Sequence, residues 1–114
     1  MNGIIAAVGL AVMLLLSAQS QAVYYYSGND LLQECESDSA AAYNICAGYI
    51  MGIHDFREEV ARLREKKTFC APKGATSGQL VKVVTKYLSD HPEDLHTAAS
   101  GLVFIAQSEA FPCS

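Results

Sequence analysis

The clearest pattern in the first half of the chain is a row of apolar residues at steps of three and four, which is the spacing of one helix face. It predicts a long helix over residues 40–66. Gly48 and Gly52 flank Tyr49 within it, and their missing side chains share one face, so we expect another backbone of the same domain to approach there. The apolar row consists of Cys46, Tyr49, Ile53, Phe56, Val60 and Leu63.

Two further patterns predict a helical hairpin in the second half of the chain. Thr76 and Gln79 have the spacing of a capping box, which predicts a helix that ends near Asp90. Pro92 is typical of a first helical position and predicts a second helix that continues to about Ala110. A shorter helix is expected before Cys35, and no strand-like alternation of useful length occurs. The sequence therefore predicts an all-α fold, a small bundle of about four helices stapled by disulfides.

The first 22 residues form a separate segment. No charged residue occurs before Asp30, and residues 4–16 are a continuous apolar run. This run is too short to span a bilayer as a helix but suits the hydrophobic region of a signal peptide. Ser20 and Ala22 place small residues at the −3 and −1 positions of a cleavage site. We expect cleavage after Ala22, export to the periplasm and a mature domain over residues 23–114 with no membrane association.

Charge and length narrow the class of protein. The chain carries 8 basic and 12 acidic residues, a formal net charge of −4, which disfavours nucleic-acid binding. A mature chain of this size forms one small domain, so multidomain enzymes and doubly wound nucleotide-binding sheets are excluded. A small exported protein that binds a partner is the leading interpretation.

Four cysteines in a short exported domain predict two disulfides. If residues 43–66 form one helix, it carries the chain about 30 Å from Cys46, and the four residues from Lys66 to Cys70 return at most roughly 14 Å. A bond from Cys46 to Cys70 is then out of reach. We predict the pairs Cys35–Cys46 and Cys70–Cys113, and the helical hairpin brings the second pair together. A helix break at Gly48 or Gly52 would leave the other pairings open.

The sequence offers little catalytic chemistry. With every thiol in a disulfide and no Gly-x-Ser-x-Gly elbow, we predict no enzymatic activity and no cofactor. A metal carrier is an alternative, because two histidines and two acids cluster at residues 91–96. His91 and His96 are five positions apart, however, and cannot point the same way on a regular helix, so we predict no metal site.

The best candidate for recognition is the segment 67–75, which joins two long helices. Cys70 anchors it, and its exposed candidates are Phe69, Lys73 and Gly74. A rigid loop loses little entropy when it docks on another protein. The alternative for Phe69 is that it folds into the core. His54 and Asp55, in the middle of the long helix, form either a pocket beside Tyr49 or a surface pair.

Several motifs together carry a family resemblance. They are CAGYIMGIHD at 46–55, CAP at 70–72, QLV at 79–81, HPE at 91–93 and FPC at 111–113. In this order, over residues 27–113, they resemble the Rap/Tai family of small periplasmic immunity proteins. The resemblance implies an all-helical, disulfide-bonded and often dimeric protein without catalysis. It also implies a partner, a peptidoglycan amidase delivered by type VI secretion, whose substrate groove the protein plugs. The alternative function is a periplasmic stress chaperone or another small exported binding protein.

Overall fold

Helices make up most of the part of the chain that the computed structural model describes, residues 25–114. The expected signal peptide and its cleavage point after Ala22 lie outside these residues. The elements are α2 (Gly28–Glu36), α3 (Ala40–Arg64), α4 (Ser77–Asp90), the single 3₁₀ turn η1 (Pro92–Asp94) and α5 (Ala99–Ala110). The predicted all-α fold is confirmed for these residues, and none of their helices combines the length and apolar character needed to cross a bilayer.

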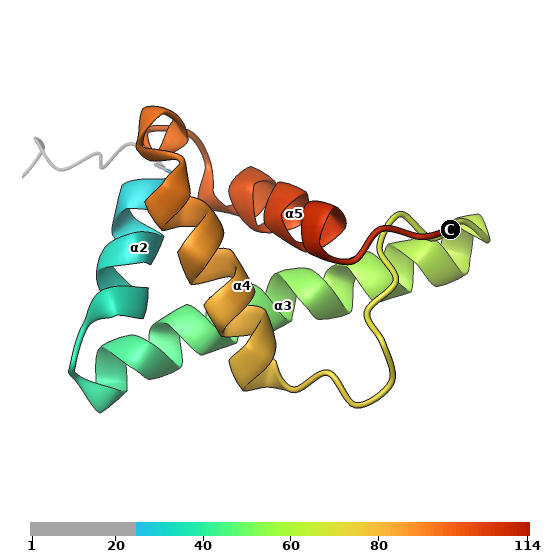
Figure 1. Cartoon of the computed structure of the whole chain (residues 1–114), viewed down its shortest axis with the longest axis horizontal. Helices are drawn as coiled ribbons and strands as arrows, with labels where there is room; N and C mark the ends of the chain where they lie inside the picture. Colours follow the sequence, from blue (N-terminus) through green and yellow to red (C-terminus); the bar gives the residue numbers. More distant parts are fainter. Residues whose placement is uncertain (1–24) are drawn as a thin grey trace, which may run out of the picture.

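Helix α3 is the longest element, and the other helices pack along it (Figure 1). Helix α2 lies against its N-terminal half, α4 crosses it, and α5 runs beside its middle. Local capping explains where α3 and α4 begin. Ser39 caps α3 through the amide of Ala42, and Thr76 and Gln79 form the predicted capping box at the start of α4.

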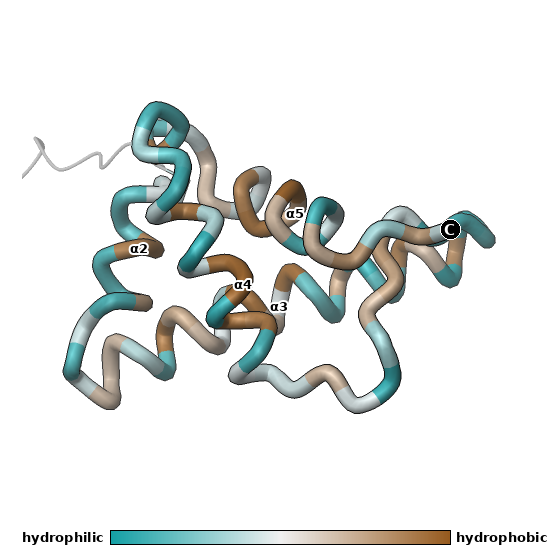
Figure 2. The backbone as a smooth tube through the Cα atoms, in the orientation of Figure 1, coloured by the Kyte–Doolittle hydropathy of each residue, from teal (hydrophilic) through white to brown (hydrophobic). Residues whose placement is uncertain are grey.

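The core lies where α2, α4 and α5 meet the first half of α3, and Figure 2 shows the apolar stretches of α4 and α5 there. Its members come from every helix, so each contributes one apolar face to a common interior. The largest fully buried apolar side chains are Leu31, Ile50, Val84, Leu88 and Val103.

The helix predicted to start at Pro92 starts later, at Ala99, which corrects the sequence-based expectation. The intervening backbone is bonded to the segment that leads into α2. Gly28 N donates to Thr97 O, Asn29 N donates to Leu95 O, and Ala99 N donates to Tyr26 O. These bonds join residues about 70 positions apart in the sequence, so a local helical pattern cannot reveal them.

The buried face of α3 agrees with the predicted apolar row in the first half of the helix, at Cys46, and departs from it in the second half. Its buried residues are Cys46, Ile50 and Arg57, whereas Phe56 and Leu63 are 68% and 67% exposed. One residue is a rotation of about 100° around a helix, so the apolar row that contains Phe56 lies beside the core-facing row. Helix α3 therefore carries a second apolar face outside the core.

The expected close packing at Gly48 and Gly52 is wrong. Both are exposed, and an added Cβ would meet no atom within 4 Å. The crowded glycine is Gly28, where a Cβ would lie 2.5 Å from Leu102 Cδ1 and 3.0 Å from the backbone of Leu95. Tyr49, between the two exposed glycines, packs against Tyr26 with ring centroids 5.2 Å apart.

All four cysteines are paired, as Cys35–Cys46 and Cys70–Cys113. This is the pairing that the helix-length argument favours, and α3 runs unbroken through both glycines. The first bond joins α2 to α3. The second joins the loop after α3 to the segment after α5, beside a hydrogen bond of 2.9 Å from Cys70 N to Phe111 O.

Candidate partner-binding surface

Phe69 lies in the core and not at the surface of the loop. It is 3% exposed and packs edge-on against His54 and Phe111, with ring centroids 5.3 and 5.8 Å away. Of the two alternatives for Phe69, an exposed contact residue or a ring folded into the core, the structure shows the second. Burial of this ring and the Cys70 disulfide hold the middle of the loop in place.

The tip of the same loop is exposed and has a defined turn. Ala75 N donates to Pro72 O at 3.1 Å, and Gly74 has a φ of 92°, a conformation that favours glycine. Lys73, next to it, is exposed. The loop therefore presents Lys73 and Gly74 from a turn whose base is fixed by a disulfide.

His54 faces this loop and not Tyr49. Its ring meets Phe69, and its Nδ1 atom is buried without a hydrogen-bond partner. It borders a hollow of about 290 Å³ between α3 and the loop, which Glu58, Lys67 and Pro72 also line. Asp55, the next residue, is exposed, so the structure separates His54 from Tyr49 and leaves Asp55 at the surface.

A larger groove, which the sequence analysis missed, lies between the C-terminal half of α3 and α5. Its volume is about 530 Å³. Three of its lining side chains are cationic and none is acidic. The signal that could have found it is the apolar row of α3, which we assigned to the core. The lining residues are Ile53, Phe56, Arg57, Val60, Ala61, Arg64, Lys66, Thr68, Ser100, Gly101 and Phe104.

Arg57 forms part of the lining of this groove and is only 6% exposed. Its guanidinium carbon lies 3.8 Å from the ring centroid of Phe104 and 4.7 Å from that of Phe69. Burial lowers the pKa of Arg57, and the nearby carboxylate of Glu58 raises it by a smaller amount. The cation stays charged but is held between two aromatic rings.

The side chain of Arg57 is hydrogen-bonded only to neutral oxygens. Nη1 donates to Phe104 O at 3.0 Å and to Gln107 Oε1 at 3.2 Å. Nη2 donates to Thr68 Oγ1 at 3.2 Å and to Ser108 Oγ at 2.8 Å, while Nε has no partner. The positive charge at the groove therefore lacks a carboxylate in hydrogen-bond contact.

The cluster of acidic and histidine residues after α4 packs against the end of that helix. His91 stacks on Tyr87, with ring centroids 4.1 Å apart, and its Nδ1 lies 2.8 Å from Tyr87 O. Burial raises the pKa of Tyr87, and the carboxylates of Glu109, Asp94 and Glu93 raise it further. Within residues 25–114, no group of three metal-ligating side chains is placed to hold an ion.

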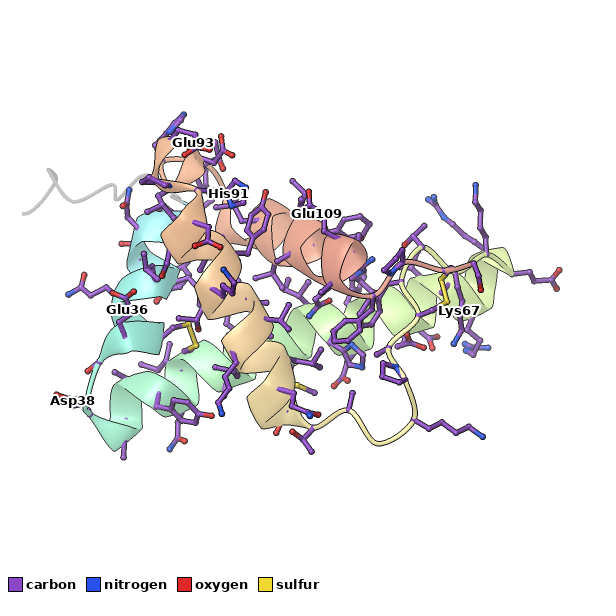
Figure 3. The ribbon with its side chains drawn as sticks, viewed as in Figure 1. Glu36, Asp38, Lys67, His91, Glu93 and Glu109 are labelled. Atoms are coloured by element: carbon purple, nitrogen blue, oxygen red, sulfur yellow. A yellow bond between two sulfur atoms is a disulfide. The ribbon has the colours of Figure 1, made fainter. Side chains whose placement is uncertain are left out.

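The α2 and η1 end of the molecule is acidic. Figure 3 shows Glu36, Asp38 and Glu93 there and Lys67 at the opposite end. The C-terminal end of α3 and the loop that follows it carry mixed charge, because Arg62, Arg64, Lys66 and Lys73 lie there among Glu58, Glu59 and Glu65. Arg62 is paired with Glu59 and Lys67 with Glu58, so this end has only a small excess of cations.

Comparison with known proteins gives one match. A family model described as Rap1a immunity proteins matches residues 27–113, which is nearly the whole of the described chain. No curated protein and no solved structure matches.

Proposed function

Because the chain belongs to the Rap1a immunity protein family, we propose that it neutralises a peptidoglycan amidase toxin of a type VI secretion system. The proposed place of action is the periplasm, and the mechanism is steric exclusion of substrate from the toxin's groove. The observation that carries the proposal is the family match over residues 27–113. An immunity protein acts by binding its toxin, so the activity needs no catalytic group of its own.

Two features support action outside the cytoplasm. Disulfides persist in oxidising compartments such as the periplasm and are rare in the cytosol, and this chain holds two. The apolar leader of residues 4–16 is typical of an export signal. An amidase that cleaves peptidoglycan has its substrate in the same compartment, so inhibitor and target would meet there.

We propose the loop tip and the adjoining side of α3 as the toxin contact. Lys73 and Gly74 project from a turn fixed by Cys70, while His54 and Asp55 lie on the neighbouring helix. A preorganised turn binds with a small loss of conformational entropy. The exposed cation of Lys73 at the loop tip would pair with an acidic rim of the toxin's groove and help to fix the orientation of the complex.

An inhibition assay with the amidase encoded by a neighbouring reading frame tests the proposal. The immunity protein is produced with its own leader, purified from the periplasm and mixed with the amidase and peptidoglycan. We expect cleavage to stop at equimolar protein and a stable complex to elute from a sizing column. Undiminished cleavage without a complex would eliminate the proposal.

The surface is tested by charge reversal in the same assay. Lys73→Glu at the loop tip should weaken inhibition by roughly tenfold or more if Lys73 is a central contact. Lys82→Glu is the matched control, because Lys82 is an exposed lysine on α4. Equal inhibition by both variants would remove the loop tip from the contact.

A further inference from the structure

The groove between α3 and α5 has the size of a small-molecule site. Its volume is about 530 Å³, and ligand sites in proteins usually enclose about 300 to 1,000 Å³. Two of its aromatic walls remain accessible, because Phe56 is 68% exposed and Phe104 is 43% exposed. Exposed apolar surface that is gathered in one concave place often marks a binding site.

The apolar part of the groove extends along α3. Ile53 and Val60 come from this helix, and Phe104 lies across the groove on α5. From Ile53 to Arg64 the helix rises by about 16 Å, at about 1.5 Å per residue. An occupant that follows the helix over this length must be extended and largely apolar, because burial of apolar surface is the main gain available along these walls.

Two cations without an acidic partner lie at one end of this apolar wall. Arg64 is the last residue of α3, Lys66 follows it, and both line the groove. The neighbouring cations Arg62 and Lys67 are paired with glutamates, whereas neither groove cation takes part in an ion pair within the described part of the chain. Glu65, between the two groove cations in sequence, does not line the groove. A negative group is therefore the complement that this end of the groove lacks.

Arg57 adds a buried positive charge to the same groove. Its side chain lines the groove and donates only to neutral oxygens. Its Nε atom is buried without a hydrogen-bond partner. Because water screens a buried charge only weakly, Arg57 favours an anion in the groove over a neutral molecule or a cation.

We propose that the groove binds a fatty acid, a single aliphatic chain that ends in a carboxylate. The aliphatic chain lies along Val60 and Phe104 and covers the exposed side of Phe56. The carboxylate lies beside Arg64 and Lys66. An alcohol of the same length would leave both cations without a partner, and an acid with a short chain would leave the apolar walls in water. Only the combination of chain and charge uses both parts of the groove.

This site is separate from the proposed toxin contact. His54 precedes Phe56 by two residues, a rotation of about 200° around the helix, and it faces the loop. The groove and the loop tip therefore lie on different sides of α3. The fatty-acid proposal does not depend on the proposed function, and the two can be tested separately.

Isothermal titration calorimetry with dodecanoate, kept below its micellar concentration, tests this proposal. The protein is purified from the periplasm and freed of lipid on a hydrophobic resin, and we expect one dodecanoate to bind per chain. Decanoate, which is two methylenes shorter, should bind roughly tenfold more weakly, because each buried methylene raises the affinity roughly fourfold. Dodecyltrimethylammonium, which has the same chain and the opposite charge, should show no saturable binding.

A pair of double variants tests the role of the two groove cations. Arg64→Ala combined with Lys66→Ala should raise the dissociation constant of dodecanoate roughly tenfold or more, because the carboxylate loses its charged donors. Arg62→Ala combined with Lys67→Ala is the matched control. It removes two neighbouring cations that do not line the groove and should leave the dissociation constant unchanged. Equal effects of the two double variants would contradict the site.

A second pair of variants fills the groove without removing charge. Gly101 lines the groove, and an added Cβ there would meet nothing within 4 Å. Gly101→Leu should therefore retain the helical circular dichroism and abolish dodecanoate binding. Gly48→Leu is the matched control, because Gly48 is equally open but lies outside the groove. Dodecanoate binding that persists in Gly101→Leu, or equal binding of dodecyltrimethylammonium to the wild type, would overturn the proposal.

Other occupants of the groove would give different results. Absence of dodecanoate binding up to about 1 mM overturns the proposal. If in that case the wild type is a dimer that Gly101→Leu dissociates, a second copy of the chain covers the groove. If instead Gly101→Leu loses inhibition of the amidase, the groove belongs to the toxin. Dodecanoate binding by a protein that fails to inhibit the amidase would overturn only the proposed function.

Discussion

At the scale of single residues, Arg57 connects three segments that are far apart in the sequence. Its guanidinium joins α3 to Thr68 in the loop and to Gln107 and Ser108 in α5. A buried cation loses hydration, and neutral acceptors and two aromatic faces offset that cost only in part. Its contribution to stability therefore depends on the complete set of partners.

Replacement of Arg57 by alanine should destabilise the fold. The substitution opens a cavity and leaves the buried Oε1 of Gln107 without a donor, so we expect a loss of about 3 kcal/mol. Urea unfolding of the purified domain measures it. Arg62→Ala on the same helix removes only an exposed ion pair with Glu59 and should leave the free energy of unfolding nearly unchanged. Equal losses for the two variants would contradict the role assigned to Arg57.

Tyr87 should make the stability fall at high pH. Burial and three carboxylates raise the pKa of Tyr87 above its ordinary value of 10.0, so the folded protein holds this proton more tightly than the unfolded chain. The resulting stability is complete below the unfolded pKa, about 10, and is lost as pH rises through the higher folded pKa.

The comparison of wild type with Tyr87→Phe isolates this effect. We expect the free energy of unfolding of the wild type to fall more steeply than that of the variant as the pH rises above about 10. Tyr43→Phe, at an exposed position of α3, serves as the reference substitution. Parallel pH profiles for wild type and Tyr87→Phe would show that this tyrosine does not contribute.

At the scale of elements, the sequence predicts those helix starts that are fixed by interactions between residues close together in the chain. The capping box of Thr76 and Gln79 lies within four residues of the helix it starts, and the start of α4 is predicted correctly. The start of α5 was not, because Ala99 donates to the carbonyl of Tyr26 across the fold. Local patterns therefore predict helices well and the segments between them less well.

The candidate site shows the same division. Exposure of Lys73 and Gly74 follows from a turn that the sequence indicates, whereas the burial of Phe69 depends on His54 and Phe111 from other segments. In the second half of α3 the buried face was assigned to the wrong row, because Arg57 is polar by type and buried only through its distant partners. A row of apolar residues on a helix does not by itself show whether that face is buried in the core or exposed at the surface.

Two glycines should respond in opposite ways to alanine. Gly28→Ala forces a Cβ against Leu102 and the backbone of Leu95, and we expect a loss of about 1–3 kcal/mol from this overpacking. Gly48→Ala meets open space in the middle of α3 and should stabilise the protein by about 0.5–1 kcal/mol. Urea unfolding of both variants gives the comparison, and a destabilising Gly48→Ala would restore the close packing that the sequence suggested.

At the scale of the whole molecule, the two disulfides stabilise different parts of the fold. Cys35–Cys46 closes a sequence separation of 11 residues inside the helical core, and Cys70–Cys113 closes one of 43. By the chain-entropy relation, the longer closure stabilises by about 4 kcal/mol and the shorter by about 3 kcal/mol, although the mechanism is model-dependent. The longer bond also fixes the loop that we propose as the toxin contact.

Mild reduction should open the two bonds in a fixed order. Thiol–disulfide exchange requires access to a sulfur atom, and both Cys70 and Cys113 are exposed whereas Cys46 is 0% exposed. At low dithiothreitol, alkylation and mass spectrometry should therefore label Cys70 and Cys113 first, with helical circular dichroism retained because Cys35–Cys46 remains closed. Inhibition of the amidase should weaken at the same stage, since the freed loop must then be ordered on binding. Earlier labelling of Cys35 and Cys46 would mean that the α2–α3 end opens more readily than the loop, and the order argued from exposure would be wrong.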